Sequence, residues 1–333
     1  MSNVTRVVTT CLNGHRAPTV GANREFTLGV LDQALWLRPD IVCLPEACTT
    51  NGVAPVDGRQ VAEQVPGMTT EAVAERARRG QCYIICPMYT VRDGTIHNSA
   101  LLFDRSGEIT GIYDKVHPVT SMPDYTVFES GTTPGTEAAT FDLDCGRVGI
   151  QICFDVGFPE TWAVLAQRGA RLVFWPSAYH GGLPLQTYAS LHQYYVVTSV
   201  GRDRSRIIDP CGRVVRETDA QVNVVAYDLN LDFAVCHYDF NYAIPDRIME
   251  KYGDRVRVSS YVDDGVFIVE PLDEGITSEA LQQEFGFESM QAYYDFHRRG
   301  YRSLAEGTRP APQKARHGAR AQYRKTTGDR SKE

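Results

Sequence analysis

The feature that most constrains the fold of this 333-residue chain is a regular alternation of strand-like and helix-like runs. Residues 6–12, 40–44 and 81–89 are short apolar runs of strand character. Residues 23–37 and 70–79, between them, carry apolar side chains at helical spacing. An alternation of this kind predicts an α/β protein with buried strands.

Hairpin-like pairs interrupt this alternation in the middle of the chain. Residues 98–104 and 108–114 flank one short turn, and residues 138–143 and 147–153 flank another. The later segments return to the first rhythm and are predicted as helices 159–167 and 185–194 and strands 171–175, 195–201, 205–208, 213–217 and 221–228. Many short strands with mixed connections favour two mixed β-sheets with outer helices over one doubly wound sheet.

The pattern is looser beyond about residue 230. Residues 246–252 and 277–300 are predicted to be helical and residues 265–270 to be a lone strand. The tail, residues 309–333, holds eight Lys or Arg against two acidic residues, a charge of +6, so the rest of the chain carries −13. A basic tail poor in apolar residues predicts disorder. The alternative is contact with nucleic acid or an acidic surface, but no basic face elsewhere indicates a specific nucleic-acid partner.

The cysteines and the first residues predict the compartment. The nine cysteines are odd in number and show no CxxC spacing. Four of them, Cys11, Cys43, Cys82 and Cys86, lie in apolar runs and are expected to be buried. No cationic patch followed by an apolar stretch opens the chain, and no run approaches the roughly 18 apolar residues of a membrane span. We therefore expect a soluble, cytoplasmic protein with reduced thiols and no metal site.

Cys153 differs from the other cysteines in its setting. An apolar strand-like run ends at this thiol, and helix-like sequence follows from Pro159. Reactive groups of open α/β sheets gather beyond the carboxyl ends of the strands, where a sharp turn exposes the side chain that it carries. Cys153 is therefore a candidate for covalent catalysis.

Two charged residues follow strand-like runs in the same way, namely Glu46 and Lys115. A cysteine hydrolase needs a base for its thiol and its water, and a positive group where the oxyanion develops. Glu46, Lys115 and Cys153 together supply these roles. A Cys-His pair is the alternative, with His117 or His180 as the candidate by position.

These residues lie in motifs that resemble those of the nitrilase superfamily of carbon–nitrogen hydrolases. The resemblance covers roughly residues 4–230 and predicts a hydrolase domain over residues 1–230. Its motifs are Leu-Pro-Glu at 44–46, Tyr-Asp-Lys-Val-His at 113–117, Gly-Ile-Gln-Ile-Cys-Phe-Asp at 149–155 and Phe-Pro-Glu at 158–160, with support from 98–100, 175–178 and 205–212. The fold that this resemblance implies is a four-layer αββα sandwich.

The resemblance also implies roles for the individual residues. Glu46 is expected to be the general base, and Lys115 to stabilise the tetrahedral intermediate. Cys153 is expected to form a thioester, with the Phe154 N–H helping to bind the oxyanion. No cofactor or metal enters this scheme.

A second acid is expected after the lysine. Many relatives have a glutamate there, four residues before a Phe and seven before a Gly. In this chain Asp124 stands at that place. Its side chain is one carbon shorter, and Glu129 is the alternative acid.

The residues after the cysteine indicate the substrate. True nitrilases of this superfamily usually have Trp and then Glu, whereas this chain has Phe154 and Asp155, as amidase-like and carbamoylase-like branches do. We therefore expect hydrolysis of a linear amide or N-carbamoyl compound that releases ammonia or an amine. Nitrile hydrolysis and acyl transfer by the same residues are alternatives, as is a catalytically inactive scaffold that binds a partner through the tail.

Several residues are candidates for the substrate pocket. They share a place near the motifs or just past a strand and are Asn98, His117, Trp175, Tyr179, His180 and Arg202. Arg202, like Arg204, is a candidate for binding a substrate carboxylate.

Residues 231–308 are predicted to form a C-terminal extension. Because members of the resembled family usually form dimers or larger assemblies, the extension is expected to wrap a neighbouring subunit in a homodimer or higher homo-oligomer.

Overall fold

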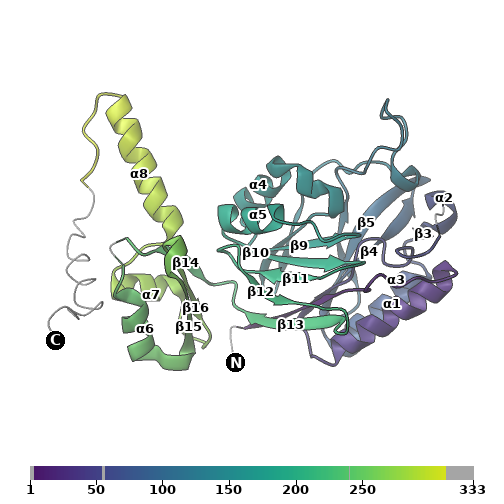
Figure 1. The fold of residues 1–333 in the computed structure, drawn as a ribbon, viewed down its shortest axis with the longest axis horizontal. Coiled ribbons are helices and arrows are strands. Elements are labelled where there is room, and N and C mark those ends of the chain that lie inside the picture. The colour runs from purple at the N-terminus through teal and green to yellow at the C-terminus, as the bar shows by residue number, and fades with distance from the viewer. Residues whose placement is uncertain (1–3, 55–56, 240, 313–333) are drawn as a thin grey trace. The chain divides into compact units, whose positions relative to one another are not determined.

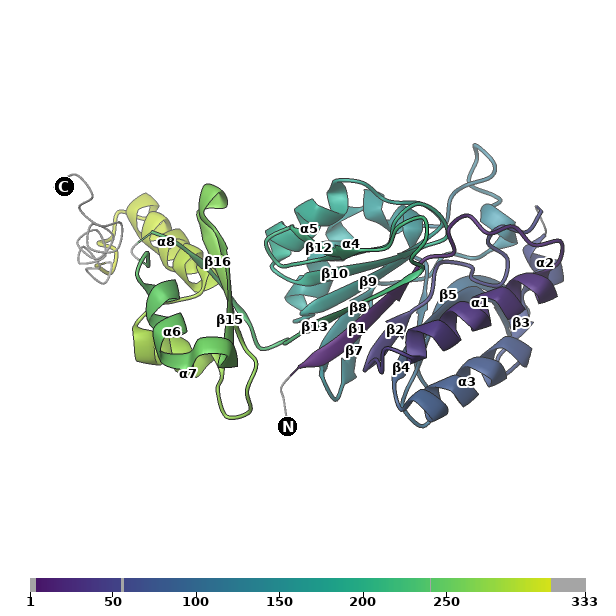
Figure 2. The same cartoon turned by 60° about the horizontal axis from the view of Figure 1, so that its bottom comes forward.

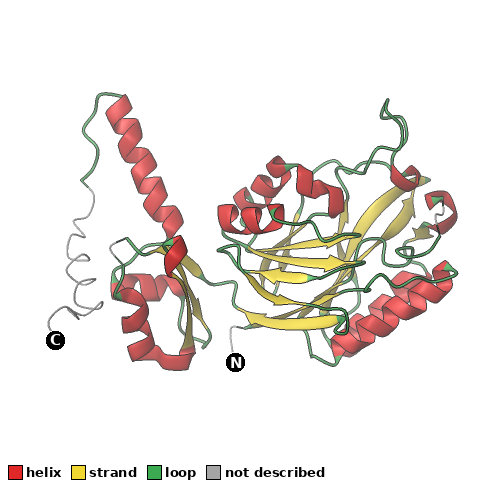
Figure 3. Ribbon diagram, viewed as in Figure 1, coloured by secondary structure: helices red, strands yellow, loops and turns green. Residues whose placement is uncertain are grey.

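The structure is a computed structural model that describes residues 4–54, 57–239 and 241–312. The chain divides into two compact units. The larger is Thr5–Leu229, and the smaller comprises Val4 and the described residues from Asn230 onward. Figures 1 and 3 show the elements of each unit. Most of the tail for which disorder is predicted, residues 313–333, lies outside the described residues.

The first sheet of the larger unit has seven strands in the order β13-β1-β2-β4-β5-β6, with β3 paired to β4. The pairs β1–β2 and β2–β4 are parallel. The pairs β1–β13, β4–β5 and β5–β6 are antiparallel. Its strands are β1 (Thr5–Thr10), β2 (Ile41–Cys43), β3 (Glu63–Gln64), β4 (Tyr83–Arg92), β5 (Thr95–Phe103), β6 (Ile109–Asp114) and β13 (Val224–Leu229).

The second sheet has six strands in the order β12-β11-β10-β9-β8-β7. Its centre, β8, β9 and β10, is parallel, and its outer pairs are antiparallel. Its strands are β7 (Thr140–Leu143), β8 (Gly146–Ile150), β9 (Leu172–Ser177), β10 (Tyr195–Val200), β11 (Arg206–Ile208) and β12 (Val214–Glu217). The predicted mixture of hairpins and crossovers is therefore present in both sheets.

Helices cover the outer faces of the two sheets. The helices α1 (Val20–Leu35) and α3 (Met68–Gly80) pack on the first sheet, and α4 (Pro159–Gln167) and α5 (Pro184–His192) pack on the second. Figure 2 shows α1 and α3 side by side. A short helix, α2 (Gly58–Val61), precedes β3.

The two sheets meet at β1 and β10 through a buried polar contact. The hydroxyl of Ser199 donates to the Cys43 carbonyl at 2.9 Å and lies 3.1 Å from the Thr10 hydroxyl. Hydrogen bonding satisfies these buried polar groups and aligns the sheets. The layers are thus helix, sheet, sheet and helix, as predicted.

The smaller unit differs from its prediction. The segment 265–270 is not a lone strand, because β16 (Val266–Pro271) lies between β14 (Ala234–His237) and β15 (Val256–Tyr261). The segment 277–300 is not one helix, because Gly286, at φ +71°, ends α7 (Ser278–Phe285) before α8 (Met290–Ala305) begins. The other helix is α6 (Ile244–Tyr252).

Within the described residues, no helix combines the length and the apolar character needed to cross a membrane.

Candidate active site

Three strand ends of the larger unit bring the predicted catalytic residues together. Glu46 follows β2, Lys115 follows β6 directly, and Cys153 follows β8. Their exposed fractions are 5%, 1% and 8%. Charged side chains are rarely buried to this extent unless they are paired. The site therefore joins residues from both sheets.

The carboxylate of Glu46 is held by three donors. Its Oε1 accepts from Lys115 Nζ at 2.9 Å and from Asn98 Nδ2 at 2.9 Å. Its Oε2 accepts from the Ala178 N–H at 2.9 Å. These bonds fix the orientation of a buried carboxylate, which is what a general base requires. Sequence reasoning did not identify the Ala178 N–H.

Lys115 lies between two carboxylates. Its Nζ donates to Glu129 Oε1 at 2.6 Å as well as to Glu46. Burial disfavours the ammonium, but the negative charges of Glu46, Cys153 and Glu129 outweigh it and raise the pKa of Lys115 above the ordinary lysine value. Lys115 is therefore a permanent cation at neutral pH.

Cys153 begins a short 3-10 turn and has a φ of +48°. A residue other than glycine rarely takes this conformation, and such strain concentrates at functional sites. The Trp175 indole N–H donates to the Cys153 carbonyl at 3.0 Å. Burial and the charge of Glu46 raise the pKa of the thiol well above its usual value, although Lys115 and a hydrogen bond from Ser177 act in the opposite direction. The resting thiol is therefore protonated and needs a base.

A buried carboxylate, Asp155, ties the cysteine turn to the lysine strand. Its Oδ2 accepts from the Tyr113 hydroxyl at 2.7 Å and from the Ile152 N–H at 2.8 Å. Its Oδ1 accepts from the His117 N–H at 2.9 Å and lies 2.8 Å from His117 Nδ1. The His117 ring also stacks on Phe158, with centroids 3.6 Å apart. His117 is thus a partner of Asp155 rather than a base for Cys153, contrary to the Cys-His alternative.

The structure corrects the position of the second acid. Asp124 lies on an exposed loop, where hydrogen bonds from Thr126 lower the pKa of its carboxyl group. Glu129, five residues further on, contacts Lys115 instead. The loop carries Asp124 away from the lysine, so the alternative acid named from the sequence, Glu129, occupies the site.

The remaining pocket candidates divide into two groups. Asn98, in β5, donates to Glu46 and also to Glu129 at 3.3 Å. Tyr179 packs edge-on against Trp175, and burial together with the charges of Cys153 and Glu46 raises the pKa of its hydroxyl group. Both therefore lie near the candidate catalytic groups.

The other group has no hydrogen bond or ring contact with Glu46, Lys115 or Cys153 among the described residues. Burial, and to a smaller extent the positive charge of Arg206, lowers the pKa of the His180 imidazole. The backbone carbonyl of His180 accepts a hydrogen bond from the same arginine. Arg202 and Arg204 are exposed, and Arg204 pairs with Glu217 at 2.6 Å. Within the described part of the chain, no contact directs Arg202 or Arg204 toward Cys153.

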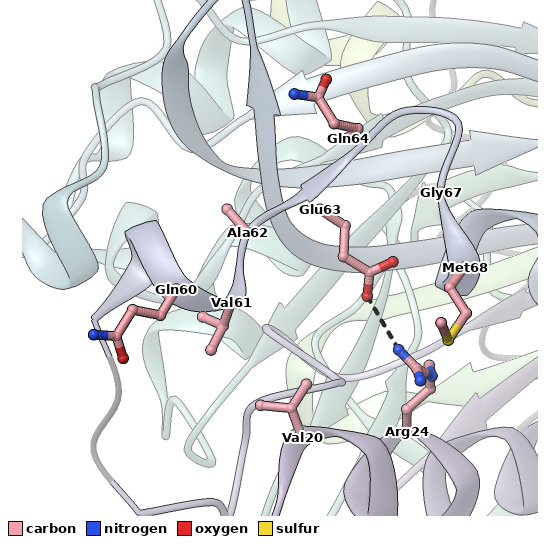
Figure 4. Close-up of a pocket in the computed structure, with 9 residues that line it drawn as sticks. All are labelled: Val20, Arg24, Gln60, Val61, Ala62, Glu63, Gln64, Gly67 and Met68. Carbon is pink, nitrogen blue, oxygen red and sulfur yellow. Dashed lines mark ion pairs between the residues drawn. The ribbon is translucent and has the colours of Figure 1, made fainter.

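A separate cleft of about 340 Å³ is open to solvent on the larger unit (Figure 4). It lies between the start of α1 and the α2–α3 segment and contains the Arg24–Glu63 ion pair, at 3.6 Å. None of the predicted site residues lines it.

Among the residues that the structure describes, no group of His, Cys, Asp or Glu is arranged to hold a metal ion.

We predict that Glu129→Gln lowers kcat by about tenfold or more, because it removes a charge-assisted hydrogen bond from Lys115, the lysine expected to stabilise the oxyanion. Asp124→Asn, the matched control on the exposed loop, should leave kcat within about twofold. Steady-state kinetics on one amide substrate compare the two. A large loss with Asp124→Asn and none with Glu129→Gln would contradict the assignment.

The fold is a four-layer α/β sandwich in which a buried Glu, Lys and Cys follow strand ends. The family model described as carbon-nitrogen hydrolase matches residues 14–234. The chain therefore belongs to the carbon-nitrogen hydrolase family, within the nitrilase superfamily, and is an amidase-like hydrolase.

Individual relatives agree with this membership. The omega-amidase NIT2 of Homo sapiens is 30% identical over 212 residues, which cover 57% of this chain and 76% of the relative. Nit3 of Saccharomyces cerevisiae, a member of branch 10 of the nitrilase superfamily, has a TM-score of 0.60 at 20% identity and covers 75% of this chain and 97% of its own. An amidase from Nesterenkonia AN1 has a TM-score of 0.55 at 20% identity and covers 68% and 90%. These structural similarities confirm the predicted αββα fold.

Proposed function

We propose that this hydrolase cleaves the C–N bond of a small linear amide through a thioester on Cys153. The observation that carries the proposal is the buried contact of Glu46 with Lys115 beside a thiol in a strained turn. A base, a fixed cation and a nucleophile then lie within one buried site, where electrostatic effects are strong. The nine cysteines further suggest a cytoplasmic, reducing environment for this thiol.

Acylation begins with a proton transfer. Glu46 removes the proton from the Cys153 thiol as the sulfur attacks the amide carbonyl. Negative charge develops on the carbonyl oxygen, where the Lys115 ammonium and the Phe154 N–H stabilise it. Glu46 returns the proton to the leaving nitrogen, the C–N bond breaks, and ammonia or an amine departs.

Hydrolysis of the thioester uses the same groups. Glu46, again a carboxylate, accepts a proton from water as the water oxygen attacks the thioester carbonyl. The second tetrahedral intermediate is stabilised at Lys115. It collapses with cleavage of the C–S bond, and the proton on Glu46 returns to the sulfur. The products are the carboxylic acid and the free thiol.

The expected substrate class is a linear amide or an N-carbamoyl compound rather than a nitrile. Phe154 and Asp155 after the nucleophile support this choice, because the amidase-like and carbamoylase-like branches that the chain resembles have these residues where true nitrilases usually have Trp and Glu. The printed name of the Homo sapiens relative, omega-amidase, supports the amide over the carbamoyl compound.

We expect ammonia release from linear primary amides to exceed that from nitriles of the same chain length by at least about tenfold in kcat/KM. Replacement of an amide by a nitrile removes the N–H group and the carbonyl for which the site is arranged. A coupled ammonia assay on matched amides, carbamoyl amino acids and nitriles measures the ratio. Preference for a nitrile would overturn the substrate class, and the absence of turnover and of thiol labelling would favour an inactive scaffold. Acyl transfer is detected by adding hydroxylamine and measuring the hydroxamate.

We also propose that the extension, residues 231–308, forms a homo-oligomer through α8. None of the side chains in this helix is fully buried, and Tyr301 and Leu304 are 69% and 61% exposed. Exposed aromatic and aliphatic side chains on one helix are typical of an interface.

The oligomer proposal predicts that the double variant Tyr301→Arg/Leu304→Arg lowers the molar mass of the particle. Charges at these positions oppose burial in an interface. Light scattering measures the mass, and truncation after about residue 232 should have the same effect. Val262→Arg, at an exposed position of the same unit, is the control and should leave the mass unchanged. A monomeric wild type, or an unchanged mass in the double variant, would refute the proposal.

A further inference from the structure

Arg206 is a buried cation that the proposed reaction does not use. It begins β11 and is 4% exposed. Burial lowers the pKa of its guanidinium, and the charge of Glu217 only partly opposes this. Removing a guanidinium from water costs free energy unless its hydrogen bonds are well matched. The hydrogen bonds of this side chain therefore indicate which part of the protein it stabilises.

These contacts are directed to one segment of the chain. Nη2 donates to the carbonyl oxygens of His180 at 3.0 Å and Gly182 at 3.1 Å, and Nη1 lies 3.5 Å from Gln186 Oε1. Nε has no hydrogen-bond partner among the described residues. Glu217 is opposite Arg206 in the strand pairing, but its carboxylate pairs with Arg204. Arg206 thus binds the backbone after β9 rather than a carboxylate.

That backbone, residues 178–183, connects β9 to α5 and begins at the active site. The Ala178 N–H donates to Glu46. Tyr179, the next residue, packs edge-on against Trp175, whose indole donates to the Cys153 carbonyl. The charges of Cys153 and Glu46 both contribute to the raised pKa of the Tyr179 hydroxyl group. A shift of this segment would therefore move a side chain that packs against the ring holding the Cys153 carbonyl.

Two glycines form the middle of this segment. Gly181 and Gly182 have φ values of +74° and +68°, which glycine adopts freely and which cost conformational entropy to fix. A Cβ at Gly181 would lie 2.5 Å from a Trp175 ring carbon, so the backbone approaches the ring closely. Hydrogen bonds from Arg206 to the carbonyls on both sides of Gly181 keep the backbone in this place.

We propose that Arg206 is a positioning residue that holds residues 179–182 and so determines how long an acyl chain the active site accepts. This inference rests on the proposed amide hydrolysis. Arg206 does not touch the substrate. It acts through Tyr179, which packs edge-on against the Trp175 ring that donates to the Cys153 carbonyl.

The test compares Arg206→Met with Arg204→Met on a series of linear primary amides of increasing length. Arg206→Met should raise kcat/KM for the longest amide relative to the shortest by about tenfold, mainly through KM, because the loss of a charged hydrogen bond is of that order. Arg204→Met, at an exposed position two residues away, should leave this ratio unchanged.

Hydrogen exchange provides a second readout that does not depend on turnover. Backbone amides of residues 180–183 should exchange faster in Arg206→Met than in wild type or Arg204→Met. Arg206→Lys, which retains a cation and a donor, should be intermediate in both measurements and serves as the test variant if the methionine variant does not fold. Unchanged exchange, or an equal loss for all chain lengths, would overturn the proposal. An inactive wild type with the expected exchange would refute the proposed function but not the anchoring role.

Discussion

Cys153→Ala is expected to lower the turnover of an amide substrate by at least about 10⁴-fold, as removal of a nucleophile does in other covalent hydrolases. No other described group can replace the sulfur, because Glu46 is occupied by three donors and Lys115 by two carboxylates. The substitution removes one buried atom and leaves the turn and its hydrogen bond from Trp175 in place. The protein should therefore remain folded.

Ammonia release and intact-mass spectrometry measure this prediction. The wild type should show an acyl adduct on Cys153 during turnover, and peptide mapping should find alkylation at Cys153 after exposure to iodoacetamide. The variant should carry neither modification at this position. Cys43 and Cys86, whose burial raises their pKa well above the usual thiol value, are internal controls that should stay unlabelled. Retention of more than a small fraction of turnover by Cys153→Ala would exclude the thioester mechanism.

Lys115→Met should both abolish turnover and destabilise the fold by about 3–5 kcal/mol, the range measured when one partner of a buried ion pair is removed. The ammonium is 1% exposed and lies between two carboxylates, and its loss leaves Glu46 and Glu129 uncompensated. Because the folded pKa of Lys115 is raised, its contribution to stability is fully present below the pKa of an unfolded lysine, about 10.4, and decreases only as pH rises through the folded pKa. The loss should therefore be measured near neutral pH.

A double variant separates the two effects of the lysine. Lys115→Met/Glu129→Gln should recover part of the lost free energy of unfolding, because one uncompensated carboxylate is gone, but it should not recover turnover. Urea unfolding followed by circular dichroism gives the free energies, and the ammonia assay gives the rates. Unfolding of Lys115→Met at the same urea concentration as wild type would contradict the electrostatic account.

The site shows which residues could be predicted without the structure. Cys153 and Glu46 follow apolar runs that must be buried strands, so the positions of these side chains at strand ends could be inferred from the sequence. Glu129 could not be inferred in the same way. It lies beyond an exposed loop with no periodicity, and the path of that loop decides whether residue 124 or residue 129 reaches Lys115.

The smaller unit shows the same limit on a larger scale. The apolar pattern of strand β16 can be recognised in its own sequence. Its pairing partners β14 and β15 are other segments of the chain, and the pattern of β16 does not identify them. Pairing of strands depends on contacts that are distant in sequence, and local patterns do not contain them. The lone strand predicted for residues 265–270 was wrong for this reason.

The sequence by itself therefore determined the layers of the larger unit and the three catalytic candidates, because strand and helix periodicity and strand-end motifs are local properties. The tertiary structure decided what surrounds Cys153. Glu129, and not Asp124, contacts Lys115, and His117 contacts Asp155. The buried guanidinium of Arg206 donates to the backbone of the segment after β9. Burial and charge pairing arise only when elements distant in sequence meet, and these two quantities control the chemistry of the thiol.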